Sequence, residues 1–319
     1  MNSRQMNRRE FLRSIVCAGG AAAFGGCRMF SFGGRENLTV FISDTHVGTE
    51  SAYQLGYLRR TVDAILGMHP RPKRVVCFGD IAYLRGPVED YRLSRPEFER
   101  LPAAGIDLVF AMGNHDRRAN FLEVWPEYRG RTLVKDRFVN IVDLGDADLL
   151  LLDTLHELDE RSTEEDENRG WITPGQLKGE QLEWLKTEMP RRKRPFFLGA
   201  HHAVNEITDG DWKAVNDLVM ATPLCVGWIH GHDHEWFTRR IKKSDQSWWG
   251  VFPTKRMLGL PSTGHWGDLG FVRFTTDTAS ARAELEITDH FFPRVVNRQS
   301  PLDDDLVAEK RGAFMTFRW

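Results

Sequence analysis

Met112-Gly113-Asn114-His115-Asp116 directly follows the apolar run Asp107-Leu108-Val109-Phe110-Ala111. An amide, an imidazole and a carboxylate in succession are costly to bury unless each group finds a partner. An apolar strand that ends in such a cluster indicates a site at the edge of a sheet. There a metal ion or a phosphate group would supply the missing partner.

The same arrangement occurs at four other places in the chain. Seven of the 11 histidines lie at the five places together. In open α/β sheets the functional site lies beyond the carboxyl ends of the strands, so these residues are expected to meet there. The four further apolar runs are 38–43 before Asp44-Thr45-His46, 74–79 before Asp80, 195–200 before His201-His202, and 224–229 before His230-Gly231-His232-Asp233-His234.

The order of the expected elements indicates an α/β fold with two mixed sheets packed face to face and flanked by helices. Residues 137–144 and 148–153 predict a hairpin across Gly145-Asp146-Ala147. The charged stretch 84–105 contains three prolines and is expected to be irregular and partly helical. The remaining predicted helices are 52–68, 211–220 and one from an N-cap at Thr173-Pro174 to Met189, and the final predicted strands, expected to be antiparallel, are 236–241, 257–261, 270–275 and 281–288.

Composition fits a soluble globular protein, with 319 residues, 41% hydrophobic and 28% charged. The formal net charge is −2, and without residues 1–27, which hold four Arg and one Glu, it is −5. This balance does not favour a general nucleic-acid binder. Cys77 and Cys225 lie in apolar strand runs and are expected to be buried free thiols, with no disulfide framework.

Residues 1–27 resemble a bacterial twin-arginine signal peptide. Arg8-Arg9 precede Phe11-Leu12, and an Ala/Gly-rich stretch follows that is too short for a stable membrane anchor. Ala23–Cys27 resembles a lipobox in which Cys27 would be lipidated, although Phe24 stands where Leu is more usual. The alternative expectation is a basic, disordered N-terminus. Residues 28–37 are expected to be a linker, and export would place the protein in the periplasm or cell envelope.

Seven side chains in these blocks are candidate metal donors. They supply oxygen and nitrogen and no thiolate, which suits Mn, Fe or Zn. Seven donors suffice for two ions that share one carboxylate, and such pairs activate water and stabilise displacement at phosphorus. The candidates are Asp44, His46, Asp80, Asn114, His201, His232 and His234.

The five blocks, in this order, resemble the calcineurin-like metallophosphoesterases. The resemblance covers residues 38–290, with 291–319 as a C-terminal extension, and it implies a four-layered αββα sandwich. It also implies that Asp80 bridges two metal ions. One ion would be held by Asp44, His46, Asp80 and His234, and the other by Asp80, Asn114, His201 and His232.

The resemblance assigns two further roles at the central block. His115 would face the substrate as a general acid or as a hydrogen-bond donor to the phosphate, and Asp116 would orient its ring. Gly79–Tyr83 also matches a block of the purple acid phosphatases in which the Tyr binds iron. Those enzymes have Gly at the position of His46, so His46 is expected to be the ligand here and Tyr83 to be a packing residue.

Other polar residues near the blocks have expected roles outside the ligand set. His202 would lie behind the ligands or face the substrate, His230 would be packed, and Asp233 would form hydrogen bonds. The Gly264-His265-Trp266 stretch would either line the site or form a surface loop with a packed Trp. The acidic stretch 156–169 reads as a solvated loop, with a flap over the site as the alternative.

Three functions follow from these observations. The first is an exported phosphoesterase that acts on a small phosphorylated substrate, with no nucleic acid expected and membrane attachment only through Cys27. The second is a nuclease of the same fold, against which the acidic charge and the export signal count. The third is a non-catalytic binding module that keeps the metal site for stability.

Overall fold

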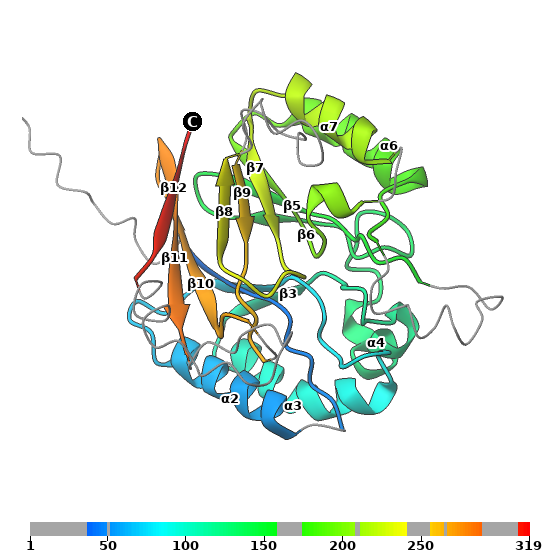
Figure 1. Cartoon of the computed structure of the whole chain (residues 1–319), viewed down its shortest axis with the longest axis vertical. Coiled ribbons are helices and arrows are strands. Elements are labelled where there is room, and N and C mark those ends of the chain that lie inside the picture. The colour runs from blue at the N-terminus through cyan, green and yellow to red at the C-terminus, as the bar shows by residue number, and fades with distance from the viewer. Residues whose placement is uncertain are drawn as a thin grey trace, which may run out of the picture. The chain divides into compact units, whose positions relative to one another are not determined.

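Two six-stranded mixed sheets form the centre of the fold (Figure 1). In the first sheet, three parallel strands continue into three antiparallel ones, in the order β12-β11-β10-β1-β2-β3. These strands are β1 (Leu38–Ile42), β2 (Arg74–Cys77), β3 (Asp107–Phe110), β10 (Gly270–Thr276), β11 (Ser280–Ile287) and β12 (Phe314–Arg318).

The second sheet has the order β4-β5-β6-β7-β9-β8, with four parallel strands between two antiparallel edges. The predicted hairpin is confirmed as its first two strands. The run after residue 230 was expected to be wholly antiparallel, but β9 pairs in parallel with β7. The strands are β4 (Asn140–Asp143), β5 (Asp148–Leu151), β6 (Phe196–Ala200), β7 (Cys225–His230), β8 (Phe237–Arg240) and β9 (Arg256–Gly259).

This computed structural model describes residues 37–49, 52–157, 174–207, 211–240, 256–264, 267–288 and 312–319. Several predictions lie outside these ranges: the signal peptide, nearly all of the linker, most of the acidic stretch, His265-Trp266, and residues 291–311 of the extension. In the described ranges no helix is both long enough and apolar enough to span a bilayer.

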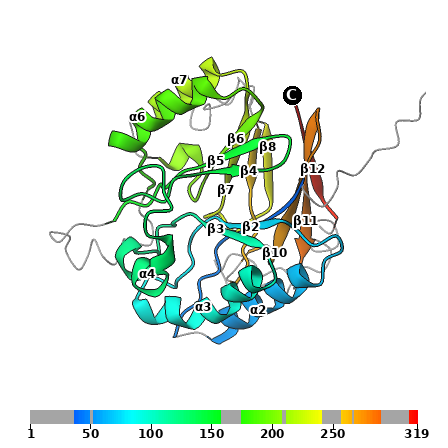
Figure 2. The same cartoon turned by 180° about the vertical axis from the view of Figure 1, so that it is seen from behind.

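Helices cover the outer faces of both sheets, as Figures 1 and 2 show. Strand alternation divides the buried side chains into three layers, because neighbouring residues point to opposite faces. Val40 packs under the helices of the first sheet, Phe41 packs between the sheets, and Leu198 packs under the helices of the second sheet. The predicted αββα fold is therefore confirmed. The helices are α2 (Ala52–Leu66), α3 (Val88–Ala103) and α4 (Arg118–Val124) on the first sheet, and α6 (Gly179–Glu188) and α7 (Asp211–Ala221) on the second, with 3-10 turns η2 (Pro126–Tyr128), η4 (Met189–Arg191) and η5 (Val204–Glu206).

The prolines did not prevent a regular helix in the stretch predicted to be irregular and only partly helical. Helix α3 runs for 16 residues through Pro96 and Pro102. An internal proline costs a helix about 3 kcal/mol. Burial of Tyr91, Phe98 and Leu101 on one face offsets that cost, since each large apolar side chain contributes about 1.5–3 kcal/mol. Tertiary packing thus overrides the local signal.

Two other boundaries differ from the prediction. Helix α6 begins at Gly179 rather than at Pro174, because the amide of Gly175 donates to the carbonyl of Glu206 in another loop. At the other end of the chain, β12 belongs to the first sheet and buries Phe317 between the sheets. The segment expected to be an extension therefore contributes an edge strand to the domain.

Candidate metal centre

All seven predicted donors gather at the carboxyl ends of strands from both sheets. Asp44 and His46 follow β1, Asp80 follows β2, and Asn114 follows β3. His201 follows β6, and His232 and His234 follow β7. Because β1, β2 and β3 are parallel, and β6 and β7 are parallel, these strand ends meet at one edge.

The first group consists of Asp44, His46, Asp80 and His234. One ligand atom from each lies within 4.8 Å of the others, and all four residues are buried. The Nε2 atoms of His46 and His234 are 3.1 Å apart, and His234 Nε2 is 3.2 Å from Asp44 Oδ1. Ligands about 2.1 Å from a shared ion are themselves about 3.0–3.4 Å apart, so this group fits one cation.

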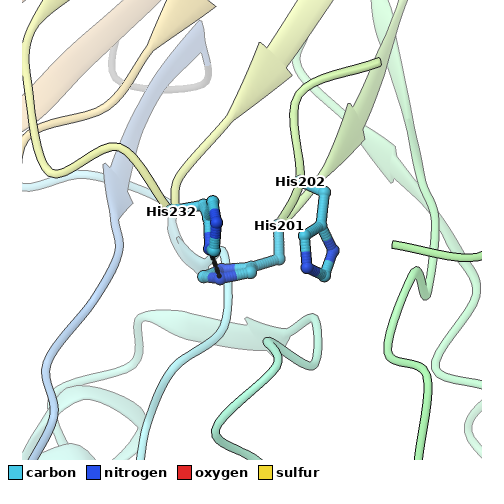
Figure 3. A group of neighbouring side chains, drawn as sticks. All are labelled: His201, His202 and His232. Carbon is cyan, nitrogen blue, oxygen red and sulfur yellow. Dashed lines mark hydrogen bonds between the residues drawn. The ribbon is translucent and has the colours of Figure 1, made fainter. Parts of the chain in front are cut away.

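The second group contains Asn114, His201 and His232, beside Asp80. Asn114 Oδ1 is 3.0 Å from His201 Nε2 and 2.9 Å from His232 Nδ1. Figure 3 shows the rings of His201 and His232 converging, with 3.2 Å between the two nitrogens. His202 lies beside them, but its Nδ1 pairs with the Thr154 hydroxyl at 2.9 Å. A ligand atom of His202 lies within 4.8 Å of those of His201 and His232. Of the two positions that the sequence left open for His202, behind the donors or facing the substrate, the bond to Thr154 favours the first.

Asp80 connects the two groups. Its Oδ2 is 3.5 Å from His46 Nε2 and 3.2 Å from His201 Nε2. Its Oδ1 accepts the backbone N–H of His115 at 2.9 Å, which fixes the carboxylate plane. A carboxylate oxygen that faces both donor groups is in a position from which it can bridge two ions.

Backbone strain is concentrated at the same residues. Among the described part of the chain, seven non-glycine residues have positive φ, and five of them are candidate donors. Such conformations cost about 1–3 kcal/mol each and persist where a functional site requires them. The five are Asp44 (54°), His46 (43°), Asp80 (50°), His232 (68°) and His234 (58°).

The electrostatics of the centre favour a cation. Burial alone would raise the pKa of Asp80, but His201 and His115 hold it well below its usual range. Burial alone would lower the pKa of His201, but Asp80 raises it to about 10, so a metal ion would have to displace the proton of this ring. Burial and His201 lower the pKa of His232 to about 3, which keeps that ring in the neutral form that binds metals. The donor set and its spacing therefore fit divalent cations.

Glycines from the predicted blocks let the loops approach each other. A Cβ on Gly113 would lie 2.1 Å from Asp80 Oδ1, and a Cβ on Gly231 would lie 2.8 Å from Asp44 Oδ2. Both contacts are shorter than side chains tolerate. Gly113 and Gly231 are thus required by the closeness of the donor loops.

His115 faces the centre without belonging to either group. Its Nε2 is 3.9 Å from Asp80 Oδ2, and its ring lies 4.9 Å from that of His46. Its Nδ1 donates to the carbonyl of Leu84 at 2.7 Å, because a carbonyl can only accept. This bond fixes the tautomer and leaves Nε2 directed at the centre.

The predicted role of Asp116 as the residue that orients His115 is wrong. Among the described residues, Asp116 accepts from the backbone N–H groups of Gly113 (2.8 Å) and Ile81 (3.1 Å) and from the Tyr91 hydroxyl (3.1 Å). Burial and the charge of Asp80 raise the pKa of Asp116 to about 7. Asp116 therefore ties the loop after β2 to the loop after β3, and the Leu84 carbonyl orients the imidazole.

Two residues near the centre were missed by the sequence analysis. Glu206 Oε1 lies 3.9 Å from Nε2 of His232, on the side of the ring away from the donors. Arg118 pairs with the buried Asp153 through two bonds of 2.7 and 2.8 Å and with Glu157 at 2.7 Å. It thereby fixes the loop after β3 to the loop after β5. Neither residue lies in a strand-end block, so the sequence carried no signal for them.

The remaining predictions near the centre concern packing. His230 is fully buried, as predicted, and its Nδ1 donates to the Gly231 carbonyl at 2.9 Å. Asp233 lies 4.0 Å from that nitrogen. The side chain of Tyr83 lies against Gly48. A Cβ added to Gly48 would be 2.5 Å from the Cβ of Tyr83. Packing of Tyr83 agrees with the choice of His46 as the donor.

Comparison with known proteins places the chain among phosphoesterases. The model of the family described as calcineurin-like phosphoesterase matches residues 38–236, which is more than half of the chain. No curated protein matches the chain.

Two solved structures with TM-scores of 0.50 or more share the fold at low sequence identity. Purple acid phosphatase PPD1 from yellow lupin (Lupinus luteus) seeds is 13% identical with a TM-score of 0.56, and the match covers 88% of this chain and 53% of that one. GAP50, the anchor in the inner membrane complex of Plasmodium, is 10% identical with a TM-score of 0.50 and 88% coverage of both chains. The 5'-nucleotidase precursor of Thermus thermophilus is 15% identical with a TM-score of 0.44, covering 85% and 57%. The chain spans about half the length of the lupin enzyme, and identities this low show the fold alone.

Proposed function

Since the chain belongs to the calcineurin-like phosphoesterase family, whose members are metal-dependent hydrolases of phosphoric esters, we propose that it holds two metal ions and hydrolyses small phosphomonoesters or phosphodiesters. The observation that carries this proposal is the position of Asp80. Its Oδ2 lies within 3.5 Å of a nitrogen from each donor group. Two groups that share one carboxylate oxygen suit a pair of cations and not a single structural ion.

The ligand assignment proposed from the geometry is the one that the family resemblance implied. Asp44, His46, Asp80 and His234 would hold one ion, and Asp80, Asn114, His201 and His232 the other. Donors of this kind suit Mn, Fe or Zn. When bound, the ions would lower the pKa of water, to give a nucleophile at neutral pH, and polarise the phosphoryl oxygens.

The protein's own residues would position the substrate and handle the proton. With Nδ1 donating to Leu84, His115 Nε2 carries a proton in the imidazolium form and can donate it to a phosphate oxygen or to the leaving group. The ring is mostly buried, with 12% of the side chain exposed, so it borders the centre and still reaches solvent. His201 Nδ1 donates to the Phe78 carbonyl at 2.9 Å, which aims its Nε2 at Asp80.

An activity screen tests this proposal directly. The metal-loaded protein is assayed with p-nitrophenyl phosphate, bis-p-nitrophenyl phosphate, cyclic nucleotides, a glycerophosphodiester and duplex DNA. We expect activity on at least one small ester, lost on metal removal and in Asp80→Ala. Activity confined to DNA would make the protein a nuclease, and full metal-stimulated activity in Asp80→Ala would remove the proposed mechanism.

A non-catalytic role is the second candidate, because a fold relative, GAP50, is described as an anchor. The strained donor backbone and the exposed edge of His115 favour the enzyme. Metal analysis decides between them. Two ions per chain agree with the hydrolase, and fewer than two under metal-replete conditions favour a binding module.

The proposed location is outside the cytoplasm, through the twin-arginine pathway. Arg8-Arg9 and the Ala/Gly-rich stretch support it, and Cys27 is proposed as a lipid attachment point. The mass of the mature N-terminus tests the second point. An unmodified N-terminus at any residue other than Cys27 would rule out the lipid.

A further inference from the structure

A buried arginine lies at the far end of β2 from the metal centre. Arg74 is the first residue of β2, and its side chain is 5% exposed. Val76 and Phe78 pack between the two sheets, so strand alternation points Arg74 into the same layer. It is a permanently charged group at the margin of an otherwise apolar interior.

Arg74 lacks hydrogen-bond partners for two of its nitrogens. In the described part of the chain, Nε and Nη1 are both buried and donate to no acceptor. The nearest carboxylates do not supply one. Asp143 pairs with Arg194 at 2.7 Å and accepts the Gly145 amide at 3.0 Å, and Asp107 is exposed. A buried guanidinium costs several kcal/mol unless it is paired, so an acceptor that reaches Arg74 would offset part of that cost.

A cavity of about 370 Å³ opens beside Arg74, between the edge strands β3 and β4. Sites for small molecules commonly have about 300–1,000 Å³. Arg131 and Asn140 add polar groups, and the Arg131 guanidinium lies 5.0 Å from the centre of the Tyr128 ring. Leu108 and Phe138 provide an apolar wall. The cavity combines a charged end with a ring and an apolar side.

We propose that this cavity binds a small organic molecule through an oxyanion group, a carboxylate or a phosphate, paired with Arg74. A guanidinium presents its donors in a planar fork that matches both groups. Arg131 would add a second positive charge, and the apolar wall would contact the body of the molecule. Asp107 and Asp143 also line the cavity, and Arg194 neutralises the second of them.

The cavity is separate from the metal centre. Arg74 and Asp80 are six residues apart along β2 and its extension, which corresponds to about 20 Å of extended chain. The inference therefore does not rest on the proposed hydrolase activity. It requires only that Arg74 keep its position in the sheet.

Calorimetry on the metal-loaded protein tests the proposal with two probes, phenylphosphonate and benzoate. Both carry a ring, and neither contains a phosphoester bond. We expect saturable binding of at least one probe and roughly tenfold or greater weakening in Arg74→Met, which keeps the aliphatic stem but not the fork. The probe that binds identifies the oxyanion. If phenylphosphonate also binds the metal centre, Arg74→Met will lose one of two sites and keep the other.

Matched variants keep the test decisive if Arg74→Met unfolds. Arg131→Gln changes an exposed residue of the cavity and is expected to weaken the same binding by several-fold without a change in Tm. Arg129→Gln, two residues away and also exposed, does not line the cavity and should bind as the wild type does. Absence of binding for both probes at millimolar concentration, or equal binding by wild type, Arg74→Met and Arg131→Gln, would overturn the proposal.

Discussion

Replacement of Gly113 by Ala should disable the metal centre through a single methyl group. The new Cβ would lie 2.1 Å from Asp80 Oδ1 and 2.4 Å from the Asp80 backbone nitrogen. Contacts of a real Cβ are no shorter than about 3.0 Å, so Asp80 and its loop must move by roughly 1 Å. The backbone contact cannot be relieved by a rotation of the Asp80 side chain.

The magnitude follows from the role of Asp80. A displacement of about 1 Å in a catalytic group typically costs about 100-fold in rate, which is roughly 2.7 kcal/mol of transition-state stabilisation. We therefore expect kcat/KM of Gly113→Ala for p-nitrophenyl phosphate, or for the best ester in the screen, to fall by about 100-fold. Bound metal per chain should fall in the same preparation.

Substitutions at two other glycines should reduce activity less than Gly113→Ala does. Gly231→Ala should have a smaller effect, because its nearest contact is the Ser43 hydroxyl, the end of a side chain that can rotate. Gly56→Ala is the control. It lies in α2 with nothing within 4 Å of the added Cβ, so activity should be unchanged and stability should rise by about 0.5–1 kcal/mol. Wild-type metal content and a kcat/KM within about threefold of wild type in Gly113→Ala would refute the reasoning.

Four further outcomes are expected. His115→Asn should lower kcat by about 100-fold or more with two metals still bound, because His115 is proposed to act on the substrate and not to bind a metal. Loss of metal from this variant would instead show that His115 is a metal ligand. Glu206→Gln should weaken metal affinity about 10–100-fold, measured by competition with a chelator, because the carboxylate lies 3.9 Å from Nε2 of His232. Glu180→Gln, at an exposed residue, is the control and should leave the affinity unchanged. Chelation of the metal should lower Tm and abolish hydrolysis. Addition of metal at about 100 times its Kd should raise the free energy of unfolding by roughly 2.7 kcal/mol. An unchanged Tm on chelation would mean that the donors are not occupied in the purified protein. Replacement of Arg8 and Arg9 by Lys should leave the precursor in the cytoplasm in a fractionation assay, and normal export of that variant would exclude the twin-arginine route.

The positions of the strand-end motifs could be predicted from the sequence because the carboxyl ends of parallel strands lie at the same edge of a sheet. Apolar runs such as 38–43 and 74–79 specify strands locally, and parallel strands bring their carboxyl ends to one edge whatever the rest of the chain does. The sequence therefore identified Asp44, Asp80 and Asn114 as neighbours and anticipated both sheets. It failed where packing outweighed the local signal, as in α3, where buried aromatic residues offset two internal prolines.

Contacts between loops could not be predicted from the sequence pattern. The family resemblance assigned Asp116 to orient His115, as a carboxylate commonly does for a working imidazole. A carboxylate bonds to whatever donors the fold presents, and here those include the amides of the loop after β2 and the Tyr91 hydroxyl. The carbonyl that orients His115 comes from Leu84, 31 residues away. The two nitrogens of Arg74 that have no partner among the described residues could not be predicted either, because burial and the lack of a partner are properties of the assembled sheets. Sequence alone thus predicted which side chains gather at the candidate centre, and tertiary structure decided how each is held, because hydrogen bonds and ion pairs depend on distance in space and not on separation along the chain.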